Sequence, residues 1–387
     1  VTLYLLRSLS GQETGRINPA PSTNITGAQN SDEGAIVMAD LNGDGFDDIL
    51  IAEPQYDGNA NYTGRVLVYY GSTTGVTIES QDGLVSPPDL VLQGELENGL
   101  FGHGLGVGDF NGDGYYDAAI GAPGWNDTSG NFIGTPGRIE VYLGNSSGLE
   151  TNAWWNATGE DDEQLGWDLS VSESMDGDAM ADLVVSARGF KEQVTDVKTN
   201  SGKLLIFNGS MSGLEHLRNI TQTKNGPMFG QSFVSNGDLN GDGMSDLIVS
   251  NTGDIASPLG LSSIEIFFGG LNGYNGTIDQ SIVSNLQGKL FGSSINYIGD
   301  VNSDGFDDFM FNEPFNGSSY RSGKIWAYYG SATGIASDAP DYTLQSVDAN
   351  AWLGRTIMPA GDVNEDGYDD VLIMQASSGN SGKVELI

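Results

Sequence analysis

The sequence contains no cysteine and only two histidines, His103 and His216. Without cysteine, neither a disulfide framework nor a thiolate metal site is available to stabilise the chain. His103 follows a Phe-Gly pair and His216 lies in a polar connector, and no serine, histidine and acid occur together at a spacing typical of nucleophilic catalysis. The sequence therefore predicts no catalytic residues.

Positive charge is also scarce. The chain has 15 Lys and Arg against 52 Asp and Glu, which gives a net charge of −37. Nucleic acids and anionic membrane surfaces are bound through basic patches, so neither is expected as a partner. No apolar run approaches the roughly 18 residues that span a bilayer, so membrane insertion is not expected. Val1 begins inside an apolar segment, and we interpret the chain as a mature or trimmed form.

Sustained helical periodicity is the third absence. The apolar runs are short, rich in β-branched and aromatic residues, and bounded by Gly, Asn, Asp and Pro, as in Asp182-Leu-Val-Val-Ser-Ala. Such runs predict strands rather than helices. The 57 glycines are about twice the usual share, which fits many tight turns.

A nine-residue pattern, Asp-x-Asn-x-Asp-Gly-x-x-Asp, is the feature that is present instead. It begins at Asp40, Asp109, Asp238, Asp300 and Asp362, and an altered copy begins at Ser174. Successive copies are 69, 65, 64, 62 and 62 residues apart. A period of this length predicts one structural unit repeated along the chain.

The pattern places oxygen ligands at alternate positions around a Gly that lets the backbone wrap. The side chains are joined by a main-chain carbonyl at position seven. The predicted metal ligands are Asp40, Asn42, Asp44, Phe46 and Asp48; Asp109, Asn111, Asp113, Tyr115 and Asp117; Asp176, Asp178, Met180 and Asp182; Asp238, Asn240, Asp242, Met244 and Asp246; Asp300, Asn302, Asp304, Phe306 and Asp308; and Asp362, Asn364, Asp366, Tyr368 and Asp370.

Ligation by oxygen alone favours Ca²⁺, because Zn²⁺ prefers Cys and His and Mg²⁺ demands a tight octahedron. An EF-hand is excluded because it needs an acid at position twelve, where this chain has Ile51, Ile120, Val185, Val249, Phe311 and Ile373. We expect five calcium sites. In the copy from Ser174 to Asp182, Ser replaces the first Asp and Ala179 replaces the Gly, so the sequence leaves its occupancy open. The simpler alternative is a set of Asp-Asn-Gly turns without metal.

Each repeat has the same order of segments. A pair such as Phe101-Gly102 precedes the Asp loop, a buried strand follows it, and a third strand begins after Gly-Arg or Gly-Lys, as in Gly64-Arg-Val-Leu-Val-Tyr-Tyr-Gly. A short last strand such as Asp89-Leu-Val-Leu-Gln-Gly completes the unit. Four short strands repeated at this period are the signature of β-propeller blades.

With Gly121-Ala122-Pro123 after the second Asp loop, this order resembles the FG-GAP repeat of integrin α-subunit propellers and their prokaryotic relatives. The resemblance implies an all-β, closed β-propeller of four-stranded antiparallel blades, with the Asp loops joining two strands of a blade and binding Ca²⁺ on its lower rim. Integrin propellers have seven blades, which remains possible here, but six loops favour six. We expect one domain, residues 1–387, with repeats at about 28–95, 96–160, 161–224, 225–286, 287–348 and 349–387.

The last repeat ends in a third-strand sequence, Gly382 to Ile387, and residues 22–26 resemble an outermost strand. We therefore expect the N- and C-terminal strands to close one blade, with the N-terminal strand coming from residues 1–27. Val1 to Leu6 duplicates a third strand. It is interpreted as an extra edge strand of the same chain, with self-association through residues 1–10 as the alternative.

Nine Asn-x-Ser/Thr sequons, at Asn24, Asn61, Asn126, Asn145, Asn156, Asn208, Asn219, Asn275 and Asn316, suggest an extracellular or cell-surface glycoprotein. The predicted function is a non-catalytic, calcium-stabilised binding or adhesion module for a protein or glycan ligand. In integrin-like propellers ligands bind opposite the metal loops. That implies a role here for the variable segments Gln55–Thr63, Trp125–Pro136, Phe190–Ser201 and Asn251–Leu261.

Two other functions remain open at this point. One is a structural subunit of a surface layer or filament. The other is a calcium-dependent polysaccharide lyase or hydrolase with His103 as general base. Such an enzyme needs cations to neutralise uronates, whereas Arg65, Arg138, Lys203 and Lys324 all begin third strands and are interpreted as structural, paired with acids or loop carbonyls. Tryptophans near the connections, such as Trp125 and Trp167, suit packing or sugar stacking.

Overall fold

Antiparallel β-sheets make up the regular structure of the chain. The computed structural model describes residues 34–73, 75, 87–126, 134–194, 197–200, 202–221, 229–251, 261–287, 291–315, 321–348, 350–375 and 383–387. Within these residues every regular element is a strand, so no helix there could cross a membrane. The predicted closing strand at residues 22–26 and the segment Val1–Leu6 lie outside them.

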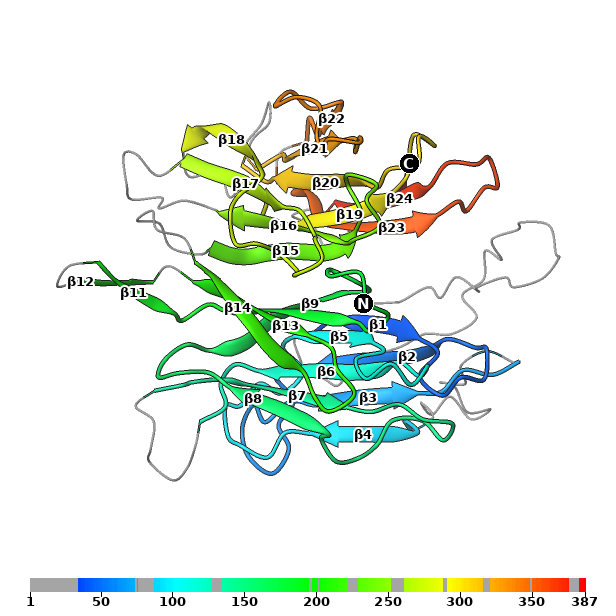
Figure 1. Cartoon of the computed structure of the whole chain (residues 1–387), viewed down its shortest axis with the longest axis vertical. Coiled ribbons are helices and arrows are strands. Elements are labelled where there is room, and N and C mark those ends of the chain that lie inside the picture. The colour runs from blue at the N-terminus through cyan, green and yellow to red at the C-terminus, as the bar shows by residue number, and fades with distance from the viewer. Residues whose placement is uncertain are drawn as a thin grey trace. The chain divides into compact units, whose positions relative to one another are not determined.

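Six sheets of three or four strands follow one another along the sequence, and five of them are built from consecutive strands (Figure 1). Their strands are β1 (Ile36–Ala39), β2 (Asp48–Glu53), β3 (Arg65–Tyr69) and β4 (Leu90–Gln93); β5 (Leu105–Gly108), β6 (Asp117–Ala122), β7 (Arg138–Tyr142) and β8 (Trp155–Thr158); β9 (Leu165–Ser172), β10 (Asp182–Ala187), β13 (Lys203–Asn208) and β14 (Glu215–Thr221); β15 (Phe229–Gly237), β16 (Asp246–Asn251), β17 (Leu261–Phe267) and β18 (Gln280–Gln287); β19 (Ile295–Gly299), β20 (Asp308–Glu313), β21 (Lys324–Tyr328) and β22 (Tyr342–Gln345); and β23 (Leu353–Gly361), β24 (Asp370–Gln375) and β25 (Lys383–Leu386).

The second strand of each sheet lies between the first and the third, which explains its continuous apolar sequence. All six residues of β2 are buried, and the same holds for β6, β10, β16 and β20. A strand covered on both faces has no solvent side to which polar residues could alternate. The outer strand β4 is mostly half-buried or exposed, as an edge position allows. The apolar runs after the Asp loops therefore mark the centre of each sheet.

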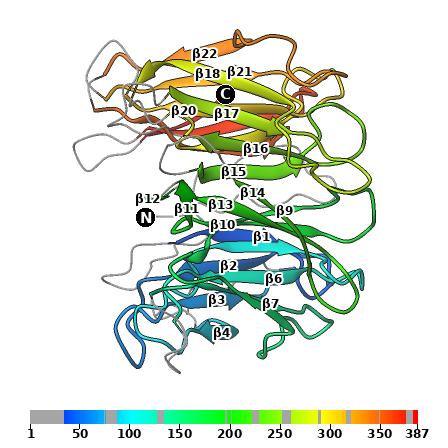
Figure 2. The same cartoon turned by 60° about the vertical axis from the view of Figure 1, so that its left-hand side comes forward.

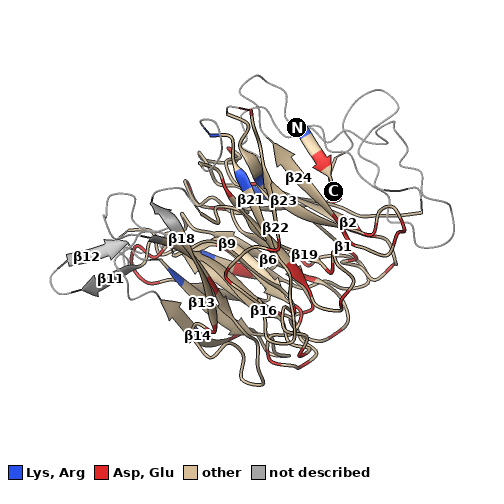
Figure 3. Cartoon of the chain, turned by 90° about the horizontal axis from the view of Figure 1, so that it is seen from above, with Lys and Arg blue, Asp and Glu red and all other residues tan. Residues whose placement is uncertain are grey.

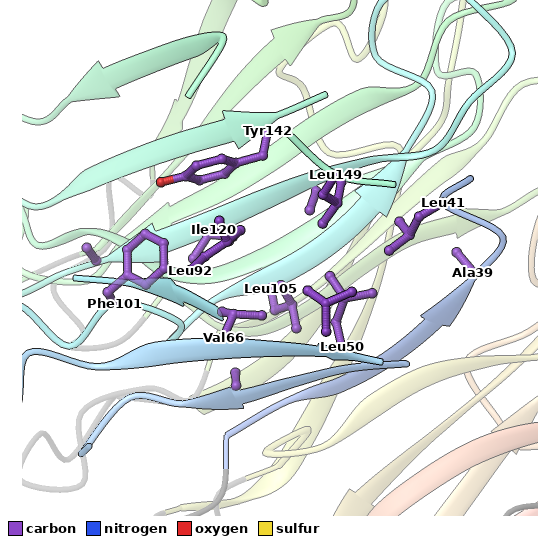
Figure 4. Packing of buried hydrophobic residues seen from close by; sticks show 14 residues of the cluster. Ala39, Leu41, Leu50, Val66, Leu92, Phe101, Leu105, Ile120, Tyr142 and Leu149 are labelled. Atoms are coloured by element: carbon purple, nitrogen blue, oxygen red, sulfur yellow. The ribbon is translucent and has the colours of Figure 1, made fainter. Parts of the chain in front are cut away.

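The Phe-Gly pair and the Gly-Arg pair meet between neighbouring sheets. The Phe101 N–H donates to the Thr63 carbonyl at 3.1 Å, and Gly64 and Phe101 form a parallel bridge. A Cβ on Gly64 would lie 2.1 Å from the Phe101 carbonyl oxygen, and its φ is +78°, so both space and backbone require glycine there. The cluster of Leu50, Val66, Leu105 and Ile120 packs beside this bridge (Figure 4).

The predicted all-β class, a β-propeller with six antiparallel blades, is confirmed. Five sheets have four strands, and the sixth has three among the described residues. Figure 2 shows the same strands from a second direction. Two compact units are distinguished. One covers the described residues up to Leu169 with Val185–Gly189 and Asn208–Glu215, and the other covers Ser170–Val184, Phe190–Phe207 and His216–Ile387.

One element falls outside the sheets. A hairpin of β11 (Lys191–Val194) and β12 (Val197–Asn200) lies between β10 and β13, and its register pairs Lys191 with Asn200. It occupies most of the predicted ligand segment Phe190–Ser201. This connection is therefore an extended ribbon rather than an irregular loop.

Candidate metal centres

Each Asp loop joins the first strand of its sheet to the second. We number them loop one (Asp40–Asp48), loop two (Asp109–Asp117), loop three (Ser174–Asp182), loop four (Asp238–Asp246), loop five (Asp300–Asp308) and loop six (Asp362–Asp370). The structure thus places every predicted ligand set in a connection within one sheet. In Figure 3 the described parts of the chain show more Asp and Glu, in red, than Lys and Arg, in blue.

The first residue of loop one organises the backbone around it. Asp40 Oδ1 accepts the Asp44 N–H at 3.0 Å, and Oδ2 accepts the Gly45 N–H at 2.8 Å. Asn42 Oδ1 accepts the Asp44 N–H at 2.9 Å. Gly45 has a φ of +86°, which turns these N–H groups inward. The loop is thus wrapped around its oxygen-bearing side chains, as the sequence pattern predicts.

The same wrapping occurs in loops two, four, five and six. The position-one residues Asp109, Asp238, Asp300 and Asp362 accept the N–H of the sixth-position Gly at 2.7 to 2.8 Å. That Gly has a φ of +85° to +90° in all four loops. Five loops therefore share one conformation.

The Asp at position nine has a role that sequence reasoning did not identify. Asp48 is fully buried, and its carboxylate accepts two main-chain N–H groups, from Leu41 at 3.0 Å and from Gly71 at 2.6 Å. The residue therefore fastens its loop to the end of the third strand. Asp117, Asp246 and Asp308 do the same through Gly144, Gly269 and Gly330 at 2.9 Å. The sequence signal was the Gly that follows each third strand.

Burial and like charge raise the pKa values of these position-nine carboxyls. Burial is the main cause, and the carboxylates at positions one and five add to it, while the main-chain N–H groups act in the opposite direction. The pKa is raised to about 6 for Asp48 and to about 7 for Asp117, Asp246 and Asp308. A cation close to the three acids would offset the repulsion among them.

The side-chain oxygens and the position-seven carbonyls are the groups that could hold a cation. Within the described parts of the chain, no three Asp, Glu or His side chains gather into a preformed cluster. In loop one the oxygens of Asp40 and Asp44 are turned toward loop N–H groups. Each carboxylate oxygen has two lone-pair directions, so one hydrogen bond leaves capacity for a cation. The oxygen-only donor set fits a hard cation.

Loop three is closed in a different way. Ser174 Oγ accepts the Gly177 N–H at 2.9 Å and donates to the Asp178 carbonyl at 3.0 Å. Ala179 does not adopt the left-handed backbone that the sixth-position Gly takes in the other five loops. In loop three the Ser174 hydroxyl donates a hydrogen bond to a loop carbonyl. In the other five loops the carboxylate at position one only accepts hydrogen bonds from loop N–H groups. The altered loop is therefore stabilised by its own hydrogen bonds.

At the end of the strands opposite the Asp loops, His103 and Arg188 both contact Trp167. His103 Nδ1 lies 2.6 Å from the Trp167 carbonyl, which can only accept, so Nδ1 carries the proton and Nε2 is the acceptor. The two rings are 4.3 Å apart, and the Arg188 guanidinium lies 4.7 Å from the indole. Burial, together with the charge of Arg188, lowers the pKa of His103. Both effects favour the neutral imidazole of His103 beside the Arg188 cation.

The other histidine differs from the sequence interpretation. His216 lies on β14 rather than in a connector, and its Nε2 is 2.9 Å from Asn219 Oδ1. This hydrogen bond is exposed and lies on the outer strand of the sheet. The prediction that the chain has no catalytic serine, histidine and acid stays a prediction.

The cations that begin third strands stack on aromatic rings. Arg65 forms an ion pair with Glu53 and lies 3.7 Å from the Tyr56 ring. Arg138 pairs with Glu140 at 3.0 Å and lies 5.2 Å from the Trp125 ring. Lys203 and Lys324 lie 4.8 Å and 3.7 Å from the rings of Phe190 and Trp326. The structure thus gives all four a packing role. Tyr56, Trp125 and Phe190 were missed because they precede the third strand across a variable connection, whereas Trp326 lies on β21 itself, two residues after Lys324.

The predicted ligand segments join the second strand to the third, at the end opposite the Asp loops. Gln55–Thr63 is described throughout, and within it the Tyr62 N–H donates to Asp57 Oδ1 at 2.9 Å. Residues 127–133 of the second segment and 252–260 of the fourth lie outside the described residues. All six tryptophans of the chain are half-buried rather than exposed. This burial favours packing over an open sugar platform.

Comparison with known proteins identifies the repeat. The FG-GAP repeat matches residues 34–69 and 101–136. Phosphatidylinositol-glycan-specific phospholipase D from Rattus norvegicus is 35% identical over 155 residues, which is 39% of this chain and 18% of that protein. Integrin alpha-5 from Xenopus laevis is 31% identical over 167 residues, 40% of this chain and 14% of that protein. The resemblance to integrin-like FG-GAP propellers is confirmed.

The chain spans less than a fifth of the length of these two relatives, so their activities do not transfer to it directly. A solved structure, Bacillus licheniformis Rhamnogalacturonan Lyase PL11, matches with a TM-score of 0.38 and 10% identity, covering 88% of this chain and 66% of that chain. A likeness this weak carries no argument about activity.

Proposed function

We propose that the chain is an extracellular or cell-surface FG-GAP β-propeller that binds a protein or glycan ligand without catalysis, and whose blades are held rigid by Ca²⁺. The observation that carries the proposal is the shared conformation of five Asp loops, each with its position-one carboxylate fixed by the sixth-position Gly. Integrin alpha-5 among the relatives supports a binding module. The assignment of the module's face and ligand rests on analogy.

Calcium is the cation that the donor set favours. In loop two, Asp109, Asn111, Asp113 and Asp117 supply side-chain oxygens and Tyr115 supplies its carbonyl. Calcium accepts six to eight oxygens at flexible geometry, so waters can complete such a set. The extracellular calcium range of about 10⁻⁴–10⁻³ M for module sites sets the expected affinity. The ion would neutralise carboxylates that crowd one another in the loop.

Thermal unfolding can test whether bound Ca²⁺ stabilises the fold. At a calcium concentration tenfold above the dissociation constant, each occupied site stabilises the fold by about 1.4 kcal/mol. We expect EDTA to lower the melting temperature markedly, and added Ca²⁺ to restore it where the same concentration of Mg²⁺ does not. An unchanged melting curve would remove calcium from the proposal.

We expect the connections between the second and third strands to contact the ligand. These connections lie at the end of each sheet away from the Asp loops, and they vary most in sequence. Protein and glycan arrays with calcium present are the direct test. Replacement of Gln55–Thr63 by a short Gly-Ser linker should abolish binding to an array hit while the melting temperature stays close to that of the parent. If this variant still bound the ligand, the ligand site would have to lie outside Gln55–Thr63.

One observation favours a second candidate, a lyase acting on acidic polysaccharide. His103 offers an unprotonated Nε2 near the Arg188 guanidinium, which is the pair of groups that proton abstraction beside a uronate carboxylate needs. Assays on uronate polymers with the parent chain, His103→Ala and the matched control His216→Ala decide it. Product formation lost only in His103→Ala would establish the enzyme. No product from the parent chain would reject it.

A further inference from the structure

Successive Asp loops are joined to one another by hydrogen bonds that do not involve the predicted ligand atoms. A main-chain hydrogen bond joins loop three to loop four, from the Ser245 N–H to the Ser174 carbonyl at 2.8 Å, and side-chain hydrogen bonds join loop four to loop five and loop five to loop six. The residue at position eight makes each of them, directly before the last predicted ligand. These residues are Ser245 in loop four, Asp307 in loop five and Asp369 in loop six, and the last two make the link with a carboxylate.

Asp307 holds the first residue of loop four from both sides. The Asp238 N–H donates to Asp307 Oδ2 at 2.7 Å, and the Asp307 N–H donates to the Asp238 carbonyl at 3.2 Å. The Asp238 side chain meanwhile accepts the Gly243 N–H at 2.7 Å. The backbone of the first ligand in loop four is thus positioned by loop five.

Asp369 makes the corresponding side-chain contact with loop five. The Asp300 N–H donates to Asp369 Oδ2 at 3.1 Å. Ser303 Oγ adds a second link by donating to the Gly367 carbonyl. Two consecutive pairs of loops are therefore connected through main-chain atoms of position-one residues.

Loops one and two provide the contrast. Position eight of loop two is Tyr116, which is 41% exposed, and among the described residues no hydrogen bond joins its side chain to loop one. The Tyr115 ring approaches Gly43, where a Cβ would lie 2.9 Å from the ring carbon Cε1. That contact is packing without a hydrogen bond to Asp40. Loop two thus lacks the link that loops five and six possess.

We propose that loops four, five and six bind Ca²⁺ with positive cooperativity, and that Asp307 and Asp369 are the positioning residues that couple them. The inference rests on the proposed calcium function. Position eight lies between a carbonyl ligand and a carboxylate ligand, so a bound ion fixes it. Because it also holds position one of the preceding loop, ordering one loop lowers the entropy cost of ordering the next.

The test is a calcium titration of the full chain by isothermal titration calorimetry after chelation, at 0.15 M salt to screen the net charge. We expect one group of ions to bind more steeply than independent sites. Asp307→Ala should weaken the ions of loops four and five by about tenfold, within the usual range of site coupling, and should flatten the isotherm. The number of ions bound at saturation should not change, because Asp307 is not a ligand.

Two further variants keep the outcome decisive. Asp307→Asn retains an accepting oxygen and should preserve most of the steepness, whereas a role for charge alone would make it behave like Asp307→Ala. Tyr116→Ala is the matched control at position eight and should leave the isotherm unchanged. Independent binding by the parent chain, or unchanged steepness in Asp307→Ala, overturns the inference and leaves calcium binding intact. Absence of any bound ion overturns the proposed calcium role as well.

Discussion

Asp48 and Gly71 are joined by a hydrogen bond of 2.6 Å from the Gly71 N–H to the Asp48 carboxylate, which ties an Asp loop to the end of the third strand of its sheet. The same relationship between Asp117 and Gly144 measures 2.9 Å. A residue that the sequence pattern presents as a metal ligand is therefore also a buried anchor of the blade. The two roles can be separated by experiment.

Substitution at position nine should destabilise the protein even without metal. Asp117→Ala deletes a buried carboxylate and leaves the Phe110 and Gly144 N–H groups without their acceptor. We expect the free energy of unfolding to fall by about 3 kcal/mol in EDTA, as measured by urea denaturation.

The matched control for that change is Asp113→Ala in the same loop. Asp113 is exposed, so its loss should change stability in EDTA by less than about 1 kcal/mol and should instead reduce the stabilisation gained from calcium. Equal losses for the two variants in EDTA would contradict the anchoring role of Asp117.

Repair of loop three should create a new metal site. Ser174 now closes the loop by donating to the Asp178 carbonyl, and Ala179 lacks the backbone of the Gly it replaces. We expect the parent chain to bind five ions, and the double variant Ser174→Asp, Ala179→Gly to bind six. Equilibrium dialysis with radioactive calcium measures both. Six ions bound by the parent chain would show that the hydroxyl closure does not prevent binding.

Two glycines with similar backbone angles should respond differently to alanine. Gly64 and Gly75 have φ values of +78° and +83°, but a Cβ on Gly64 would meet the Phe101 carbonyl at 2.1 Å, whereas Gly75 has open space within 4 Å. Gly75→Ala should cost only the left-handed strain of about 1 kcal/mol. Gly64→Ala should cost several times more, since the contact between neighbouring sheets must move. Similar urea midpoints for the two variants would argue against a close approach at Gly64.

Asp168 should make stability depend on pH. Burial raises its pKa to about 7, from the usual aspartate value of 3.8. The folded state therefore holds this proton at pH values where the unfolded chain has lost it. The resulting stability is complete below about pH 4 and is lost as the pH rises from about 4 to about 7, by about 1.4 kcal/mol per pH unit at most.

To isolate this contribution, the free energy of unfolding by urea is measured at several pH values for the parent chain and for Asp168→Asn, both saturated with calcium. The difference between the two should change steadily from pH 4 to pH 7 and then level off. A constant difference across that window would place the ionised carboxylate in the folded state.

The parts of the fold that recur along the chain were predictable from the sequence. The Asp loops at Asp40 and its equivalents, the buried strands that follow them and the Gly before the third strands β3, β7, β13 and β21 were placed correctly, because each depends on a local pattern of a few residues. The blade number followed from the repeat period. The closing strand at residues 22–26 and the calcium sites stay predictions.

Contacts between repeats were not predictable in the same way. The stacking of Arg65 on Tyr56 crosses a variable connection, and the bond between Asp307 and Asp238 joins residues 69 apart. No short pattern marks either pair, since their geometry depends on how neighbouring sheets pack. The closure of loop three by Ser174 was missed for a related reason, because a hydroxyl can donate as well as accept and only the folded loop decides which it does.

The sequence by itself determined the repeated unit, its strands and the oxygen-rich composition of its loops, because these follow from periodicity and residue chemistry within a few positions. Only the tertiary structure decided what Asp48, Asp307 and Ser174 do. Hydrogen bonds have direction and short range, so the role of a carboxylate or hydroxyl is set by which main-chain groups folding brings within about 3 Å of it.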